Sequence, residues 1–278
     1  MSGRVNIGRH VASHAILLTW TVIALFPVIL VVINSFKSRR AIFGDPLSFP
    51  NAETFSLIGY QEVFRGGAFV MYMGNSLIVT VSSLILVVLF GAMAAFALSE
   101  YRFRGNALLG LYIAMGIMIP IRLGTVAILQ LMVATGLVNT LVALILVYTA
   151  SGLPLAVFIL TEFMKTVSND LKNAGRIDGL SEYRIFFRLV LPLVRPALAT
   201  IVVFSMLPMW NDLWFPLILA PAEATKTITL GTQMFIGEFV TDWNAVLAAL
   251  SVAIVPVVLL YMVCSRQLIR GITAGAVK

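Results

Sequence analysis

The sequence has few charged residues and almost no histidine or cysteine. Asp, Glu, Lys and Arg make up 11% of the 278 residues, whereas soluble domains carry about 25%. So few charges do not cover the surface of a globular protein of this length, which argues against a soluble all-α protein. The single cysteine, Cys264, lies in an apolar run. No intramolecular disulfide is therefore possible, and we interpret Cys264 as a small buried apolar side chain.

Patterns of catalytic and metal-binding residues are also missing. The two histidines, His10 and His14, lie near the N-terminus, and the sequence has no Cys/His cluster, glycine-rich phosphate loop or Ser/His/Asp spacing. We therefore expect a chain that is not an enzyme and that binds no metal or cofactor. The formal net charge of +7 comes from basic residues beside apolar runs rather than on one face, so we expect no nucleic acid partner.

Long apolar runs are what the sequence does contain, since 60% of its residues are hydrophobic. A bilayer-spanning helix takes about 20 such residues. Six runs satisfy this requirement, at residues 14–36, 69–98, 107–131, 141–160, 193–219 and 243–265. The sequence therefore predicts an all-α integral membrane protein with six transmembrane helices in a single domain, residues 1–278. The first run is too long for a signal peptide and is interpreted as a retained anchor.

The segments between the runs predict the topology. Residues 37–67 and 220–242 are polar and are expected to form external loops, and the weakly polar corner 136–140 separates the third run from the fourth. With both termini cytoplasmic, the inner side holds Arg4, Arg9, Arg102, Arg104, Lys165, Lys172, Arg176, Arg184, Arg188, Arg266, Arg270 and Lys278. The outer side holds Lys37, Arg39, Arg40, Arg65 and Lys226. The positive-inside rule favours this orientation. In the fifth run, three prolines predict kinks or a break: Pro196, Pro208 and Pro216.

A charged segment, residues 168–192, interrupts the apolar sequence and is called the island below. Leu171, Ala174, Gly175 and Asp178 share a helical face by their spacing. We expect its small residues to admit another surface closely. Gly179 then interrupts the helical pattern, and a second amphipathic run is expected to stop at Pro192. Two short helices bent at a glycine are suited to docking into a groove of another protein. The alternative is that Lys172, Arg176 and Arg184 form a solvated face.

The island resembles the signature of the permease subunits of binding-protein-dependent ABC importers. That signature is Glu-Ala-Ala, three residues, Gly, nine residues, Ile, one residue and Leu-Pro. The matching positions are Asn173, Ala174, Gly175, Gly179, Leu189, Leu191 and Pro192. The departures are Asn173 for Glu, Gly175 for Ala and Leu189 for Ile. The string A-G-R-I-D-G-L-S-E-Y-R-I-F-F-R-L-V-L-P-L and the tail G-I-T-A-G-A-V-K resemble the MalG-like carbohydrate branch.

This resemblance implies a fold, partners and a location. The fold would be that of a type I importer permease in the bacterial inner membrane. The island would be the coupling helix, with contacts to the ATPase from Asn173, Ala174, Gly175, Arg176, Asp178, Gly179 and Arg184. The implied partners are a second, MalF-like permease, an ABC ATPase dimer that holds ATP and Mg, and a periplasmic binding protein. The substrate would be a sugar or a sugar derivative.

Arg122 is the one deep charge among the runs. It lies about 15 residues into the third run, about 22 Å from its inner end at helical rise. A charge there is costly unless it faces protein or water. Arg122 therefore either lines a translocation cavity or extends to the outer interface from a tilted helix.

A polar-aromatic cluster lies in the outer half of the fifth run: Trp210, Asn211, Asp212 and Trp214. Sugars present both polar and C–H surfaces, so this composition favours a cavity lining or an outer gate. The alternative is an interfacial aromatic belt or a helix break fixed by Asn211 and Asp212. Asn75 and Gln130 are further candidates for the substrate pathway, with interhelical hydrogen bonding as their alternative.

Two other functions are compatible with a multi-span protein. An ion-gradient-driven secondary carrier is the first, but such carriers typically show internal repeats and several intramembrane ionisable residues. The sequence shows no clear repeat. A scaffold that recruits an ATPase without transporting anything is the second.

Overall fold

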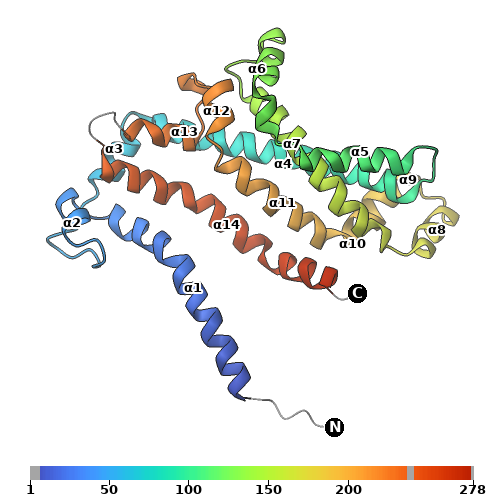
Figure 1. The fold of residues 1–278 in the computed structure, drawn as a ribbon, viewed down its shortest axis with the longest axis horizontal. Helices are drawn as coiled ribbons and strands as arrows, with labels where there is room; N and C mark the ends of the chain where they lie inside the picture. The colour runs from blue at the N-terminus through green and yellow to red at the C-terminus, as the bar shows by residue number, and fades with distance from the viewer. Residues whose placement is uncertain (1–6, 237–240, 277–278) are drawn as a thin grey trace. The chain divides into compact units, whose positions relative to one another are not determined.

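A computed structural model describes residues 7–236 and 241–276, and its regular elements are helical (Figure 1). The α-helices are α1 (Ile7–Ser35), α2 (Arg39–Gly44), α3 (Ile58–Phe64), α4 (Ala68–Glu100), α5 (Asn106–Met118), α6 (Thr125–Ala134), α7 (Leu141–Lys165), α8 (Asn169–Ile177), α9 (Glu182–Arg184), α10 (Leu191–Leu193), α11 (Arg195–Trp210), α12 (Trp214–Leu219), α13 (Ile228–Thr232) and α14 (Trp243–Ala276). Of the sequence predictions, Arg4 and residues 277–278 of the C-terminal string lie outside the described residues.

Four helices are long and apolar enough to cross a membrane by themselves, and two bent pairs bring the number to six. The single helices are α1, α4, α7 and α14. The bent pairs join α5 to residues 121–134 and residues 182–193 to α11. The prediction of an all-α fold is therefore confirmed for the described residues, and the predicted six spans are reached if each bent pair is one span.

The third predicted span is wrong as a continuous helix. It breaks after Met118, and the segments on either side are bent by 86°. Pro120 explains the break, because a proline forces the preceding residue out of the helical region. Ile119 is accordingly extended, with φ −88° and ψ 113°. Arg122 therefore lies in the short 3-10 turn η2 (Ile121–Gly124) rather than on the side of a long helix.

The predicted interruptions around the fifth span are present, but they are displaced. A break occupies residues 211–213, after the helix that contains Pro208. The second helix of the island does not stop at Pro192. It continues to Leu193 through a π-helical stretch, η3 (Ile185–Val190), and the bend of 77° with α11 follows. The π-helical turn leaves room for a proline whose ring would otherwise clash with the preceding turn.

The corner between the third and fourth runs forms as predicted. Gly136 and Asn139 have positive φ angles of 68° and 58°, a conformation that glycine and asparagine tolerate best. The Thr140 hydroxyl then accepts a hydrogen bond from the Ala143 N–H at 3.3 Å and caps α7.

The chain forms two compact units. The first contains residues 1–69 and 232–254. There Asn244 donates to the Lys37 carbonyl at 2.7 Å, and the buried Lys37 ammonium donates to the Asp45 carbonyl at 2.8 Å. Gly59 packs directly on the Asn244 backbone, since an added Cβ would lie 2.2 Å from its carbonyl oxygen. The Lys37 ammonium is therefore buried and hydrogen-bonded within the loop that follows α1.

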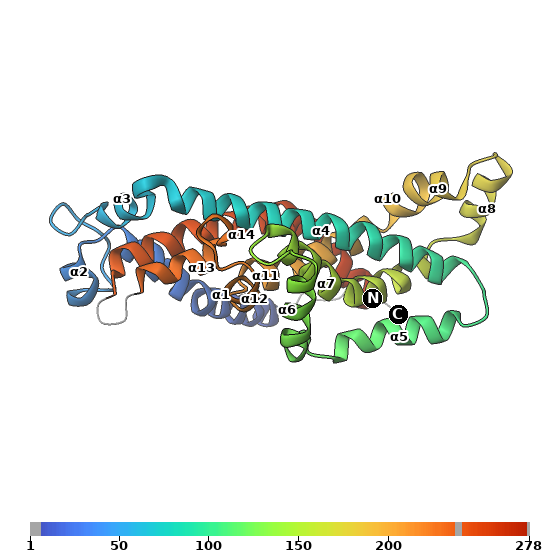
Figure 2. The same cartoon turned by 90° about the horizontal axis from the view of Figure 1, so that it is seen from above.

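The second unit, residues 70–231 and 255–278, is arranged along α4. Near the start of α4, Asn75 donates to the carbonyls of Ala224 and Lys226, both at 2.9 Å. At its other end, Glu100 contacts the island. The 25 residues between Asn75 and Glu100 span about 38 Å, more than the ~30 Å of a bilayer core. Figure 2 shows α8 and α9 near the far end of α4. This unit therefore carries the island and the 220–227 loop on opposite sides of one membrane thickness.

Candidate functional site

The bend of the island is a Schellman motif. Gly179 has φ +77°, its N–H donates to the Arg176 carbonyl at 3.1 Å, and the Leu180 N–H donates to the Gly175 carbonyl at 2.9 Å. Only glycine adopts this conformation at low cost. Ser181 then caps the next helix by accepting from the Arg184 N–H at 3.4 Å. The predicted interruption at Gly179 is therefore confirmed.

The small face of α8 does not lie where the sequence analysis placed it. Gly175 is buried against the island's own second helix, because an added Cβ would lie 2.9 Å from Leu189 Cδ1 and 3.4 Å from Ile185 Cγ1. Ala174 is exposed. Spacing alone identified two small residues on one helix, but it did not show that one of them packs internally. Gly175 therefore closes the hairpin of the island and presents no surface to a partner.

Two basic residues of the island pair with the carboxylate of Glu100. Lys172 contacts Glu100 Oε2, and Arg176 Nη2 contacts Glu100 Oε1 at 2.6 Å. The Lys172 and Glu100 side chains are only 5% and 9% exposed. A solvated Lys172 is therefore ruled out, and the island is ionically fixed to the end of α4. Sequence reasoning missed Glu100, although an acidic residue at the end of an uncharged run is visible in the sequence.

Arg176 is the centre of this network. It also donates to both oxygens of Glu182, at 2.7 and 3.1 Å, and to Asn173 Oδ1 at 2.9 Å. The hydrogen bond to Glu182 makes the largest contribution to raising the pKa of Arg176, and the hydrogen bond to Glu100 makes the next largest. Arg176 is therefore charged at all physiological pH values. The Tyr101 hydroxyl donates to Glu182 at 3.0 Å. Asn173, at the signature's Glu position, therefore contributes a neutral acceptor to this network.

The outer surface of the island is exposed, and it carries two large apolar side chains among polar ones. Ile177 is 86% exposed and Tyr183 is 72% exposed. The remaining sequence-predicted positions, Asn173, Asp178, Gly179 and Arg184, are exposed as well. Contiguous exposed apolar patches mark interaction surfaces, and the side chains of Ile177 and Tyr183 make this side of the island a candidate for one. We call Ile177, Tyr183 and these exposed positions the docking face.

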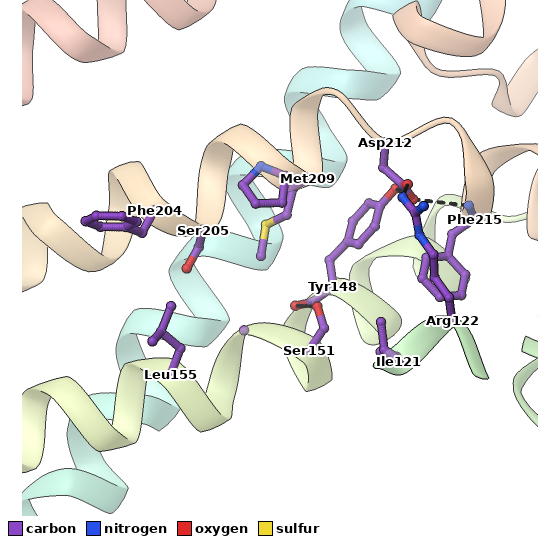
Figure 3. A pocket seen from close by; sticks show the side chains of 12 residues that line it. Ile121, Arg122, Tyr148, Ser151, Leu155, Phe204, Ser205, Met209, Asp212 and Phe215 are labelled. Carbon is purple, nitrogen blue, oxygen red and sulfur yellow. Dashed lines mark hydrogen bonds and ion pairs between the residues drawn. The ribbon is translucent and has the colours of Figure 1, made fainter. Parts of the chain in front are cut away.

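A second group of predicted residues meets beside a cavity of about 300 Å³ in the second unit (Figure 3). Asp212, 7% exposed at its side chain, accepts from the Tyr148 hydroxyl at 2.9 Å. It also caps α12 by accepting from the N–H groups of Trp214 and Phe215, at 3.2 and 3.1 Å. Asp212 thus fixes the helix break, as the alternative interpretation predicted. Sequence reasoning missed Tyr148, which no local pattern distinguishes.

Arg122 reaches the same carboxylate from the break of the third span. Its Nη2 lies 3.4 Å from Asp212 Oδ1, its guanidinium lies 6.0 Å from the Trp214 ring centroid, and its side chain is 66% exposed. Trp214 Nε1 donates to Thr125 Oγ1 at 3.0 Å. The two helix breaks are therefore tied together, and Arg122, Asp212 and Trp214 are brought into one cluster.

The other predicted pathway residues lie elsewhere. Trp210 is buried at 3% exposure, and its carbonyl accepts from Thr229 at 2.9 Å. Asn211 donates to the Leu207 carbonyl at 2.9 Å and ends α11. Asn75 holds the 220–227 loop, and Gln130 is exposed on α6. None of these four residues lines the 300 Å³ cavity.

The fold and these two sites define a multi-pass helical membrane protein with a bent polar segment between its apolar helices. Residues 87–273 match the family model described as the binding-protein-dependent transport system inner membrane component. The chain belongs to this family of ABC importer permeases, within the carbohydrate branch that its sequence resembles.

Curated relatives match over nearly the whole chain. The diacetylchitobiose uptake system permease protein NgcG of Streptomyces coelicolor is 35% identical, over 95% of this chain and 87% of its own length. The sulfoquinovosyl glycerol transport system permease protein SmoH of Agrobacterium fabrum is 32% identical, over 97% and 93%.

A solved structure shows the same fold. It is a chain of a bacterial ABC transporter involved in the import of the acidic polysaccharide alginate. The TM-score is 0.79 at 21% identity, covering 96% of this chain and 99% of the other.

Proposed function

We propose that this chain is one half of the membrane channel of an ATP-driven sugar importer in the bacterial inner membrane, with both termini cytoplasmic. The observation that carries the proposal is the island, an exposed hairpin that presents the docking face and is ionically fixed to the end of a membrane-spanning helix. Partner ATPase subunits would bind this face and hold ATP and Mg. A MalF-like permease would supply the other half of the channel.

The separation of loop and island along α4 supports this topology. With the island inside, the 220–227 loop faces outward, where a binding protein delivers sugar. The names of the relatives, which include uptake systems for diacetylchitobiose and sulfoquinovosyl glycerol, support a sugar or sugar derivative as substrate. Movement of the ATPases would reach α4 through Glu100, because that carboxylate joins the island to the helix.

Reconstitution tests the function directly. The chain, its partner permease, the ATPase and the binding protein are placed in proteoliposomes, and uptake of labelled sugars is measured with ATP or with a proton or sodium gradient. We expect uptake that requires ATP hydrolysis and the binding protein. Uptake driven by a gradient without the ATPase would instead establish a secondary carrier. Binding of the ATPase with no uptake of any sugar would establish a scaffold.

The docking face gives a more specific prediction. Ile177→Asp is expected to lower the amount of ATPase that co-purifies with the chain about tenfold or more, since burying an isoleucine contributes about 1.5–3 kcal/mol and a buried unpaired charge costs more. The matched control is Ile236→Asp, an exposed isoleucine outside the island, which should leave co-purification unchanged. Equal ATPase recovery in both variants would contradict the assignment of this face.

A further inference from the structure

The cavity beside Asp212 has its charge at one end and an aromatic ring at the other. Figure 3 shows Arg122 and Asp212 at one end and Phe204 at the opposite end, with Ser151 and Ser205 between them. Phe204 is 56% exposed. A volume of about 300 Å³ is at the lower limit of ligand sites, which reach about 1,000 Å³. The cavity thus offers hydroxyls and an aromatic face, the two surfaces that complement a sugar ring.

Its two charged groups are not equally satisfied. Each Asp212 oxygen already has two donors: Oδ1 has the Trp214 N–H and Arg122, and Oδ2 has the Tyr148 hydroxyl and the Phe215 N–H. A carboxylate with four partners has no lone pair left for a ligand.

Arg122, unlike Asp212, uses few of its hydrogen-bonding groups within the protein. A guanidinium has five N–H donors. Within the described part of the chain, the Arg122 guanidinium donates one hydrogen bond, to Asp212 at 3.4 Å, and lies 6.0 Å from the Trp214 ring centroid. Its side chain is 66% exposed beside the cavity. The accessible charge of this site is therefore positive. Guanidinium groups bind carboxylates through two parallel N–H···O hydrogen bonds. The remaining N–H donors of Arg122 can form such a pair with the carboxylate of a ligand.

We propose that this cavity is a substrate subsite for an acidic sugar, with Arg122 binding its carboxylate and Phe204 packing on the C–H face of a ring. The inference rests on the proposed function, because it names the class of sugar that the importer carries. A neutral sugar brings no negative charge to the guanidinium, so we expect Arg122 to determine specificity between the two classes.

Matched pairs of sugars test the proposal in the reconstituted complex. The probes are labelled digalacturonate against galactobiose and cellobiouronate against cellobiose, each at several concentrations with ATP. The wild-type complex is expected to take up an acidic member of a pair. Arg122→Gln should lower that uptake about tenfold or more, the range expected for a charged hydrogen bond, and Arg122→Lys should restore part of it.

Thr125→Val is the control for a purely structural role, because it removes the hydrogen bond from Trp214 that ties the two helix breaks together and leaves the residues that line the cavity unchanged. It should change acidic and neutral uptake by the same factor. If Arg122→Gln lowers the uptake of acidic and neutral sugars equally, the subsite is overturned. Arg122 then has a structural role, because its ion pair with Asp212 connects the two helix breaks. ATP-driven uptake of neutral sugars only would also overturn the subsite while leaving the proposed function intact. The absence of ATP-driven uptake for every sugar would overturn the proposed function itself.

Discussion

Glu100→Gln is expected to abolish ATP-coupled uptake while the chain still inserts into the membrane. The change leaves Lys172, 5% exposed at its side chain, without its carboxylate, and it removes one of the two carboxylates that hold Arg176. Breaking one partner of a buried ion pair costs about 3–5 kcal/mol, because the remaining charge is left uncompensated. The island then loses its attachment to α4, and movement of the ATPase no longer reaches that helix.

The measurement is uptake, together with ATPase co-purification and thermal stability of the purified complex. Glu162→Gln is the matched control, since Glu162 pairs with Lys165 at 2.7 Å on an exposed helix surface. Exposed pairs contribute about 0–1 kcal/mol, so this variant should behave as wild type. The double variant Glu100→Gln with Lys172→Met removes both charges and should regain stability but not full coupling. Wild-type uptake in Glu100→Gln would show that the ionic attachment is not needed for transport.

The spans were predictable because each depends on a run of apolar residues, a local property. The breaks within the spans were harder to predict from the sequence. Pro208 and Pro216 are predicted from the sequence as sources of a break. The third span is predicted from the length of its apolar run alone, and Pro120 bends that span by 86°. The second helix of the island continues through the π-helical turn at Ile185–Val190 and past Pro192 to Leu193. Both errors arise where a proline acts through the backbone of its neighbours and not through hydropathy.

The sites show a different limit. Gly179 was identified because its conformation follows from local sequence, but Gly175 and Lys172 were assigned to the wrong surroundings. Their surroundings come from Leu189, which is distant in sequence from Gly175, and from Glu100, which is 72 residues before Lys172. Arg122 and Asp212 were each predicted as candidates, yet their meeting across 90 residues, and that of Asp212 with Tyr148, depends on tertiary packing. Glu100 and Tyr148 lie outside the island and outside the polar-aromatic cluster, so the patterns of those segments carry no information about these partners.

Gly179→Pro is expected to abolish uptake and to weaken ATPase association, with membrane insertion unchanged. Proline fixes φ near −65° and has no N–H, whereas Gly179 has φ +77° and donates to the Arg176 carbonyl. The Schellman motif is lost with it, including the hydrogen bond from Leu180 to Gly175, so the helices that carry Ile177 and Tyr183 are no longer held at the same angle.

Gly179→Ala separates this backbone effect from a loss of space. No heavy atom lies within 4 Å of a Cβ added at Gly179, so alanine there meets only the left-handed penalty of about 1–2 kcal/mol. The alanine variant should therefore keep a measurable fraction of uptake and ATPase binding, measured side by side with proline in the same proteoliposomes. Equal loss in both variants would mean that the partner contacts Gly179 directly, whereas wild-type behaviour of proline would remove the bend from the coupling mechanism. Because the bend aims the docking face while Glu100 anchors it, Gly179→Pro should reduce ATPase binding and Glu100→Gln should mainly reduce its coupling to uptake.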